Sequence, residues 1–320
     1  MSERLDIVTV GEALVDLVAP DAHHLANATT FHRTAGGAPA NVAVAGARLG
    51  ARTALISAVG RDPFGDCLRQ LLHQEGVDTS ALALVDQRTT LAFVARNAGG
   101  IPDFVFYRGS DAALRPELVS EELIGRSTFL HASSMALLSE PSRGATLAAV
   151  EIAARRNVLV SVDPNLRPST WPSLDEARRA ISPLLRAADV LKVNDEEALL
   201  LANTHDLDEA MTVLAGKDRL LVVTLGSEGC AWRRGAESGQ VPAPRVQAIE
   251  TTGAGDAFVG ALLAELSGPA ALAGSITALP VATLSAALRF ACAAGALACT
   301  RIGAMTGLPS RPDVERLLLD

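Results

Sequence analysis

The residue types best suited to phosphate chemistry stand together in the segment 250–258, which reads ETTGAGDAF. Gly253 and Gly255 allow a tight backbone turn, and the apolar stretch 257–266 predicts a helix that begins there. The first amides of a helix lack partners and carry its positive dipole, so they form an anion site. Asp256 lies at that site, where a carboxylate could accept the proton of an attacking hydroxyl. An ordinary helix start capped by Asp256 explains the segment equally well.

A second glycine-rich segment, 35–50, reads AGGAPANVAVAGARLG. Gly36 and Gly37 permit a close approach of the backbone to a ligand, and Asn41 could both donate to and accept from a polyol. A plain Gly-Gly turn into a helix is the alternative. The segment 250–258 is neither a Walker A loop nor a dinucleotide fingerprint, because no Gly-Lys-Ser/Thr follows it and it lacks the third glycine.

The elements that must position these residues follow from the alternation of short apolar runs with longer amphipathic stretches. The runs expected as buried strands are 5–11, 53–60, 127–133, 158–163, 189–193 and 220–226. The stretches expected as helices are 41–49, 64–75, 142–156, 174–185 and 257–266. Strands separated by helices indicate an α/β fold with a mostly parallel sheet. Such sheets bind ligands at the carboxyl ends of their strands, so the polar residues after each strand are the candidates for chemistry.

Two stretches interrupt this alternation. Residues 12–35 contain short alternating pieces and a loop-like sequence in which His23 and His24 have no partner at metal-ligand spacing. Residues 89–107 read TTLAFVARNAGGIPDFVFY, two alternating runs joined by Gly and Pro, which is typical of a β-hairpin. Together the two stretches predict a small antiparallel lid over the main sheet.

The composition fits one large domain and excludes several kinds of partner. The chain has 320 residues, of which 49% are hydrophobic, so it can bury a large core. Its net charge is −8, its pI is about 5.3, and it has no basic stripe, so we do not expect nucleic acid as a partner. The spacing of the four cysteines suits neither a zinc site nor a disulfide framework: Cys67, Cys230, Cys292 and Cys299.

The most membrane-like stretch is 279–300. Pro280 opens it, Arg289 stands in its middle, and small residues dominate it, so a buried core helix is expected rather than a membrane span. The N-terminal segment 1–16 has acidic residues and alternates like a strand, unlike a signal peptide. These features predict a cytoplasmic protein without a membrane partner.

The two glycine-rich segments resemble the signatures of a known family. GGAPANVAVAGARLG is similar to the N-terminal signature of the PfkB, or ribokinase-like, carbohydrate kinases, and TTGAGDAFVGALL is similar to their C-terminal signature. The pieces GEALVD, VGRDPFG, FYRGSDA, DPNLRPSTW, KVNDEE and VTLGSEG also resemble family elements. The resemblance implies an ATP-dependent sugar kinase with a three-layer α/β/α fold. It implies a single kinase domain over 1–320, with a small β lid formed by about 12–36 and 89–112.

For the transferred phosphoryl group, the resemblance implies Asp256 as the catalytic base, with the anion hole formed by Gly253, Ala254 and Gly255. For the sugar, it implies hydroxyl binding by Asp16 in GEALVD, together with the residues Gly36, Gly37 and Asn41. The sugar itself would be a small-molecule acceptor that is phosphorylated on a primary hydroxyl.

For the nucleotide, the resemblance implies a site formed by Lys192, Asn194, Thr224, Gly226 and Gly229. Glu197 falls on the family's NxxE element, which organises Mg²⁺ through water and substrate phosphates. Many members also hold a monovalent cation such as K⁺ near the anion hole. Glu250 stands where that site usually has Asp, which leaves K⁺ dependence open. Family members often dimerise through the lid, so a homodimer is implied as well.

Two arginines bear on the choice of sugar. Arg108 in FYRGSDA and Arg167 in DPNLR resemble positions found in fructokinases and in 2-keto-3-deoxygluconate kinases. They could bind the carboxylate of an acid sugar or donate to the hydroxyls of a neutral ketose. A third interpretation is that Arg167 is structural and pairs with Asp163 or another acidic residue. The GGAPANVA turn resembles fructokinases, so we expect fructose and its 6-hydroxyl, with the acid sugar as the alternative.

Other functions fit the sequence less well. Nucleoside kinases stack the base on aromatic side chains, and aromatic residues make up only 3% of this chain. A phosphosugar would need a further basic cluster, which the sequence does not offer. A sugar sensor without catalytic activity would not need the Asp256 carboxylate and its glycines, and the chain has both.

Overall fold

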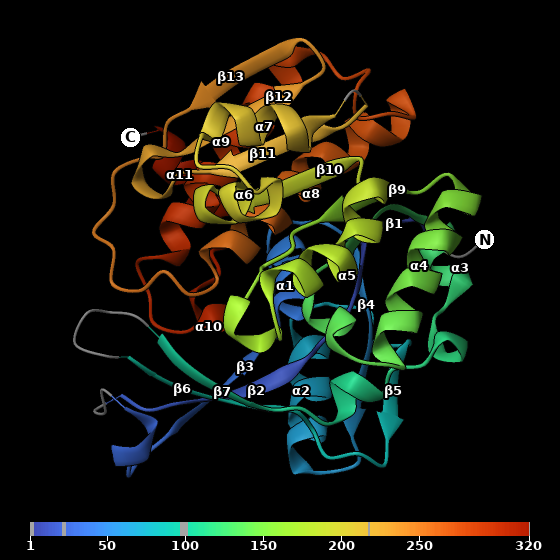
Figure 1. Cartoon of the computed structure of the whole chain (residues 1–320), viewed down its shortest axis with the longest axis vertical. Helices are drawn as coiled ribbons and strands as arrows, with labels where there is room; N and C mark the ends of the chain where they lie inside the picture. Colours follow the sequence, from blue (N-terminus) through green and yellow to red (C-terminus); the bar gives the residue numbers. More distant parts are fainter. Residues whose placement is uncertain (1–2, 21–23, 97–101, 217, 320) are drawn as a thin grey trace.

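A computed structural model describes residues 3–20, 24–96, 102–216 and 218–319 (Figure 1). Among these residues, nine strands form one sheet in the order β13-β12-β11-β10-β9-β8-β1-β4-β5. The pairs from β5 to β11 are parallel, and β12 and β13 add an antiparallel edge. The strands are β1 (Leu5–Val10), β4 (Thr53–Gly60), β5 (Leu82–Val85), β8 (Ser127–Ala132), β9 (Leu159–Val162), β10 (Val190–Asn194), β11 (Leu220–Thr224), β12 (Cys230–Arg234) and β13 (Glu237–Val241).

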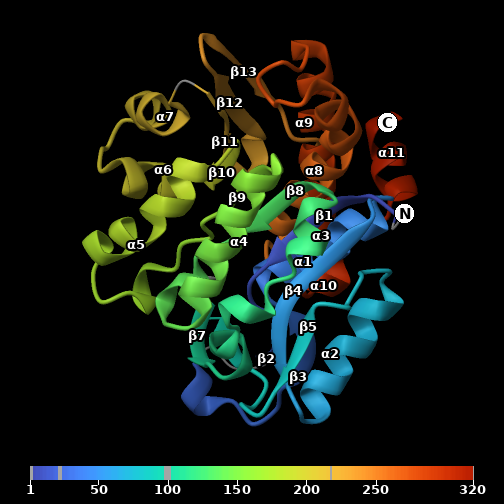
Figure 2. The same ribbon diagram turned by 90° about the vertical axis from the view of Figure 1, so that its right-hand side faces the viewer.

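Helices cover both faces of this sheet, so the predicted three-layer arrangement is confirmed (Figure 2). One face packs on α3 (Glu121–Gly125), α4 (Ser142–Arg156), α5 (Leu174–Ala187), α6 (Asp195–Ala202) and α7 (Leu207–Ala215). The other packs on α1 (Ala38–Arg48), α2 (Pro63–Gln74), α8 (Ala254–Ala273) and α9 (Val281–Ala298), with α10 (Ala304–Gly307) and α11 (Arg311–Leu319) beside them. The central strands are apolar on both faces because each face is covered.

Helix α9, Val281–Ala298, lies within the stretch 279–300 that looked membrane-like in the sequence. Both α8 and α9 are long and apolar enough to cross a membrane by length and composition alone. However, half or more of each apolar window is buried inside the protein, and the two helices pack along one another. Their apolar character is therefore explained by their place in the core.

A smaller sheet lies at one end of the molecule, next to α2 and α10 (Figure 1). In the described part of the chain its order is β3-β2-β6-β7, formed by β2 (Leu14–Val18), β3 (His32–Gly36), β6 (Leu91–Arg96) and β7 (Pro102–Tyr107). The predicted hairpin is the antiparallel pair β6–β7, while the central pair β2–β6 is parallel. The hairpin turn at 97–101 and His23 lie outside the described residues.

The small sheet begins where the large one ends. Strand β1 stops at Val10, and β2 starts at Leu14, directly beyond the carboxyl edge of the large sheet. Strand β3 then leads through Gly37 into α1, which returns along the large sheet. The two sheets therefore meet at the edge where the polar residues after each strand gather.

Candidate active site

Helix α8 begins at this carboxyl edge with the glycine-rich segment. Gly253 precedes it in the left-handed conformation, with φ 82°. A Cβ there would lie 2.8 Å from the carbonyl oxygen of Ala304, so glycine is required both for the dihedral angle and for the space. The Ala254 amide donates to the carbonyl of Thr251 at 3.2 Å. The following amides of the first turn, from Gly255 and Asp256, have no acceptor within the helix.

The side chain of Asp256 lies in that first turn and is 8% exposed. The Nδ2 of Asn41, on α1, donates to its Oδ2 at 2.8 Å. Burial raises the pKa of Asp256 to about 6, although the hydrogen bond from Asn41 lowers it. At neutral pH the carboxylate is therefore mostly ionised and only weakly stabilised, as a general base requires.

A buried ion pair lies beneath the first turn of α8. Strands β9 and β10 are in register, so Asp163 and Lys192 stand side by side, with Lys192 Nζ 2.8 Å from Asp163 Oδ2. A Cβ on Gly255 would lie 2.9 Å from the same Nζ. Burial alone would lower the pKa of Lys192, but the carboxylates of Asp163 and Glu197 outweigh it and raise the pKa. Lys192 therefore places a fixed positive charge under the anion site.

Asp16 and Gly36 lie opposite the base, on the small sheet. The two residues come together through the pairing of β2 with β3. A Cβ on Gly36 would lie 2.1 Å from Asp16 Oδ2, so glycine leaves the room that the carboxylate occupies. Burial, and then the negative charges of Asp256 and Glu250, raise the pKa of Asp16 to about 7. The fold thus brings Asp16 within electrostatic reach of the candidate base.

The turn between β3 and α1 is held by Glu12, which the sequence did not single out. Gly37 has φ 104° and packs against the Glu12 backbone, where a Cβ would lie 2.5 Å from the carbonyl oxygen. The amide of Ala38 donates to Glu12 Oε1 at 3.1 Å, while Oε2 has no partner among the described residues. Burial raises the pKa of Glu12 to about 7. The GEALVD segment therefore supplies a buried carboxyl group, Glu12, and a half-buried one, Asp16.

Asn194 and Glu197 form a capping box at the start of α6. The Asn194 side chain accepts from the Glu197 amide at 2.7 Å, and Glu197 Oε2 accepts from the Asn194 amide at 2.9 Å. Glu197 Oε1 accepts from the amide of Leu166 at 2.6 Å. Both oxygens of this buried carboxylate thus accept hydrogen bonds from backbone amides. The contact with Leu166 fixes the loop that carries Arg167. Within the described ranges, no group of three His, Cys, Asp or Glu residues could hold a metal ion.

Thr224 stands beside Asn194, because β10 and β11 pair at these two residues. Gly226 follows with φ 56°, and a Cβ there would meet nothing within 4 Å, so this turn borders open space. Gly229 has φ 97°, and a Cβ would lie 2.0 Å from the carbonyl oxygen of Val241, so its role is to close the turn into β12. Asn194, Thr224, Gly226 and Gly229 therefore share one edge, and Gly226 borders its open part, whereas Lys192 lies buried in its pair with Asp163.

Glu250 lies just before the glycine segment and is buried. Its Oε2 accepts from the amide of Gly303 at 3.0 Å, and its own amide donates to the carbonyl of Cys299 at 3.0 Å. Glu250 therefore connects the segment before α8 to the segment after α9.

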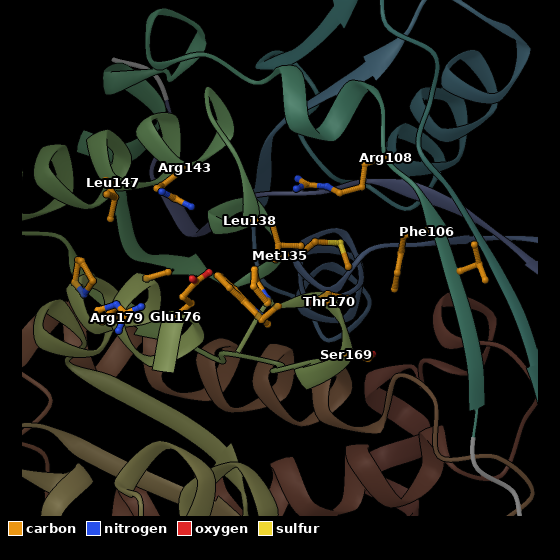
Figure 3. A pocket seen from close by; sticks show the side chains of 15 residues that line it. Phe106, Arg108, Met135, Leu138, Arg143, Leu147, Ser169, Thr170, Glu176 and Arg179 are labelled. Atoms are coloured by element: carbon orange, nitrogen blue, oxygen red, sulfur yellow. The ribbon is translucent and has the colours of Figure 1, made fainter. Parts of the chain in front are cut away.

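The two arginines differ in their surroundings. Arg108 binds Asp111 and Ser139, and it borders a cavity of about 970 Å³ between β7, α4 and α5 (Figure 3). Arg167 is exposed, and no carboxylate lies within 4 Å of it among the described residues. Asp163, its suggested partner, binds Lys192 instead. Arg167 still lies close enough to Asp256 to lower the pKa of that carboxyl group.

Comparison with known proteins identifies the family. A model described as "pfkB family carbohydrate kinase" matches residues 4–311. The chain belongs to this family. The kinase is 39% identical to probable fructokinase-4 of Arabidopsis thaliana, over 99% of this chain and 97% of that protein. It is 40% identical to fructokinase-1 of Oryza sativa subsp. japonica, over 98% of this chain and 97% of that protein.

Solved structures agree with this assignment. The kinase superposes on a fructokinase from Xylella fastidiosa with bound ATP with a TM-score of 0.88 and 34% identity, covering 98% of both chains. It superposes on a fructokinase from Vibrio cholerae O395 in a form with bound fructose, ADP and calcium ion with a TM-score of 0.86 and 35% identity, again over 98% of both. The ribokinase-like fold and the phosphotransferase class expected from the sequence are confirmed.

In this pfkB kinase the fold brings most of the predicted residues together. Asp256, Asn41 and Asp16 converge from α8, α1 and β2. Sequence reasoning missed Asp163 and Asp111 as parts of the site. Asp163 could have been found, because it is the polar last residue of the predicted strand 158–163. Asp111 follows no strand, and only the contact with Arg108 reveals it.

Proposed function

We propose that this kinase transfers the γ-phosphoryl group of ATP to the 6-hydroxyl of fructose, with Asp256 as the base. The observation that carries the proposal is the buried Asp256 carboxylate, which Asn41 holds at the start of α8. Relatives named fructokinase, one of them bound to fructose and ADP and another to ATP, support the choice of substrates.

Fructose would lie between the small sheet and α8. Asp16 would accept hydrogen bonds from sugar hydroxyls, and Asn41 would offer its Oδ1, which has no partner among the described residues. Gly36 and Gly37 would let the sugar approach the backbone closely. Arg167, which is exposed and has no carboxylate beside it in the described part of the chain, would donate to hydroxyls from the opposite side.

In the chemical step, Asp256 accepts the proton of the 6-hydroxyl as that oxygen bonds to the γ-phosphorus. The bond from the γ-phosphorus to the β,γ-bridging oxygen breaks, and ADP leaves with its electron pair. Negative charge on the transferred group would be stabilised by the Gly253–Gly255 turn, through the amides at the start of α8, and by Lys192 beneath it. General-base catalysis contributes about 10²- to 10⁴-fold to such reactions.

ATP would lie along the carboxyl ends of β10 and β11. Asn194 and Thr224 would face the phosphates, and the turn with Gly226 and Gly229 would border the ribose. Mg²⁺ bound to the phosphates would neutralise their charge. The carboxylate of Glu197 already binds two amides, so it fits a water-mediated contact with the ion better than direct ligation. K⁺ would be held by carbonyl groups near the Glu250 contacts with Cys299 and Gly303.

We further propose that residues 12–36 and 89–112 act as a lid on one kinase domain, 1–320. The outer side of the small sheet exposes Phe31 and Tyr107, which contact Phe93 edge-to-face and would suit a homodimer through the lid. Cys230 and Cys292 are buried free thiols with their sulfur atoms 3.7 Å apart, which suits a reducing cytoplasm.

The test is a coupled ADP-release assay with ATP and Mg²⁺, in which fructose and 2-keto-3-deoxygluconate are offered separately. We expect efficient turnover of fructose and a kcat/KM at least tenfold lower for the keto acid. Product analysis by ³¹P NMR should give fructose 6-phosphate. Turnover of the keto acid alone would contradict the substrate assignment, and turnover of neither would contradict the proposed function.

A further inference from the structure

The positive charge of Arg108 is engaged within the protein. Its Nε and Nη2 donate to Asp111 Oδ2 at 2.9 and 2.6 Å, and its Nη1 donates to Ser139 Oγ at 3.0 Å. All three guanidinium nitrogens therefore have partners, and the side chain is 18% exposed. The Nε–Nη2 fork, with which arginine can bind a carboxylate, is therefore already occupied by Asp111.

Asp111 is itself fixed. Its side chain is 1% exposed, and its Oδ1 accepts from the hydroxyl of Thr90 and from the amide of Gly109 at 3.3 Å. These contacts hold the carboxylate without neutralising it, so its charge acts on Arg108. The pair lies on the segment that follows β7, at the root of the small sheet.

Glu12 adds a second acidic group to the same corner. It is close enough to Arg108 and Asp111 for both charges to act on its carboxyl group. It also accepts from Ala38, directly after Gly37, and so connects this corner to the sugar-binding glycines. One arginine thus faces two buried carboxyl groups, and the corner has no net positive charge. Arg143 and Arg179 also line the cavity (Figure 3), and Arg143 Nε donates to the carbonyl of Leu137 at 2.8 Å.

We propose that Asp111 is a specificity-determining residue: by holding Arg108 it selects neutral sugars and excludes acid sugars from the acceptor site. This inference rests on the proposed function. Arg167 remains the cation that contacts the acceptor, and a single exposed arginine suits hydroxyls. Removing the charge of Asp111 while keeping its shape would free Arg108 to bind a sugar carboxylate.

The experiment compares wild type with Asp111→Asn, a substitution that preserves size and can still accept from Thr90. Both are assayed with fructose and with 2-keto-3-deoxygluconate. We expect the ratio of kcat/KM for the acid sugar to that for fructose to rise at least tenfold in Asp111→Asn. In Asp111→Asn/Arg108→Gln the gain should disappear, because Arg108 is the group that would bind the carboxylate.

Ser139→Ala is the matched control, since it removes the uncharged partner of Arg108 and leaves the ion pair; its ratio should stay within threefold of wild type. An unchanged ratio in folded Asp111→Asn, or a gain that survives Arg108→Gln, would overturn the proposal.

A second measurement needs no variant: gluconate should inhibit wild-type fructose phosphorylation at least tenfold less tightly than sorbitol. Equal inhibition would also overturn it. Failure of the proposed function is distinguishable, because wild type would then not phosphorylate fructose at all.

Discussion

The charged groups proposed for phosphoryl transfer stand on or directly after strands of the nine-stranded sheet and on α8, whereas Asp16, proposed for sugar binding, stands on the four-stranded sheet. Asp163, Lys192 and Asp256 come from elements in the middle of the core, and each is buried. Asp16 comes from β2 and Arg108 from the segment after β7, at one end of the molecule, where His32 and Arg33 of β3 are exposed. One group of side chains, at the proposed phosphoryl-transfer end, is therefore carried by buried elements of the core, and the other, at the proposed sugar end, by a partly exposed small sheet.

The chemistry required at the two ends explains this difference. Charges that stabilise a transition state act most strongly when they are fixed and shielded from water, which the interior of a parallel sheet provides. Sugar recognition depends on hydrogen bonds to a neutral ligand that must enter and leave. Side chains on a small sheet next to solvent can provide that access. Substitutions should therefore affect stability at the first end and substrate affinity at the second.

The largest expected effect is the loss of the Lys192 charge. Lys192→Met would leave the Asp163 carboxylate buried and unpaired, which costs about 3–5 kcal/mol of unfolding free energy. Urea unfolding measures the difference, and Lys192→Met/Asp163→Asn should recover most of it. Arg69→Ala, which breaks the exposed pair with Asp66, is the control and should change stability by less than about 1 kcal/mol. If Lys192→Met lowered the unfolding free energy by no more than Arg69→Ala does, the buried pair would not be more important for stability than an exposed pair, and the comparison would be contradicted.

An intermediate effect is expected for Asp16→Asn at the sugar end. The variant loses a charged acceptor for the sugar hydroxyls, worth about 1.5 kcal/mol, so the KM for fructose should rise about tenfold. Its kcat should stay within about threefold of wild type, because the groups around the phosphoryl group are untouched. Steady-state kinetics at saturating ATP measure both values. A fall in kcat with an unchanged KM would place Asp16 at the other end of the cleft.

The smallest expected effect concerns pH. Burial raises the pKa of Glu12 from its usual 4.5 to about 7. The folded protein therefore holds this proton more tightly than the unfolded chain, and the stabilisation is lost as pH rises from about 4.5 to about 7. Glu12→Gln should be as stable as wild type at pH 4.5 and should melt about 2–4 °C higher at pH 8. Thermal melts at both pH values test this, and a variant that melts lower than wild type at pH 8 would contradict it.

The elements of the large sheet could be predicted from the sequence because their signals are local. The predicted strand 53–60 matches β4, and the predicted helix 142–156 matches α4. Helix α1 begins at Ala38 rather than at 41, because Pro39 fits the first turn of a helix. Helix α8 continues to Ala273, beyond the predicted 266, because it accommodates Pro269 and ends only at Gly274, which is in the left-handed conformation.

The charged partners of the site could not be predicted in the same way. The pair Lys192–Asp163 depends on β9 and β10 being neighbours in register, and strand order is a property of the whole fold. The contact of Arg108 with Asp111 spans three residues, yet its effect depends on the burial of Asp111 beside Thr90. Motif resemblance located Asp256 and the glycines, but the charges around them required the structure.

The most direct test of the central claim measures turnover and fructose binding in Asp256→Asn. The variant keeps an acceptor for the Asn41 amide and removes only the basic carboxylate. We predict that kcat falls by about 10²- to 10⁴-fold, while the Kd for fructose measured by calorimetry stays within threefold of wild type. A kcat within tenfold of wild type would contradict the assignment of Asp256 as the base.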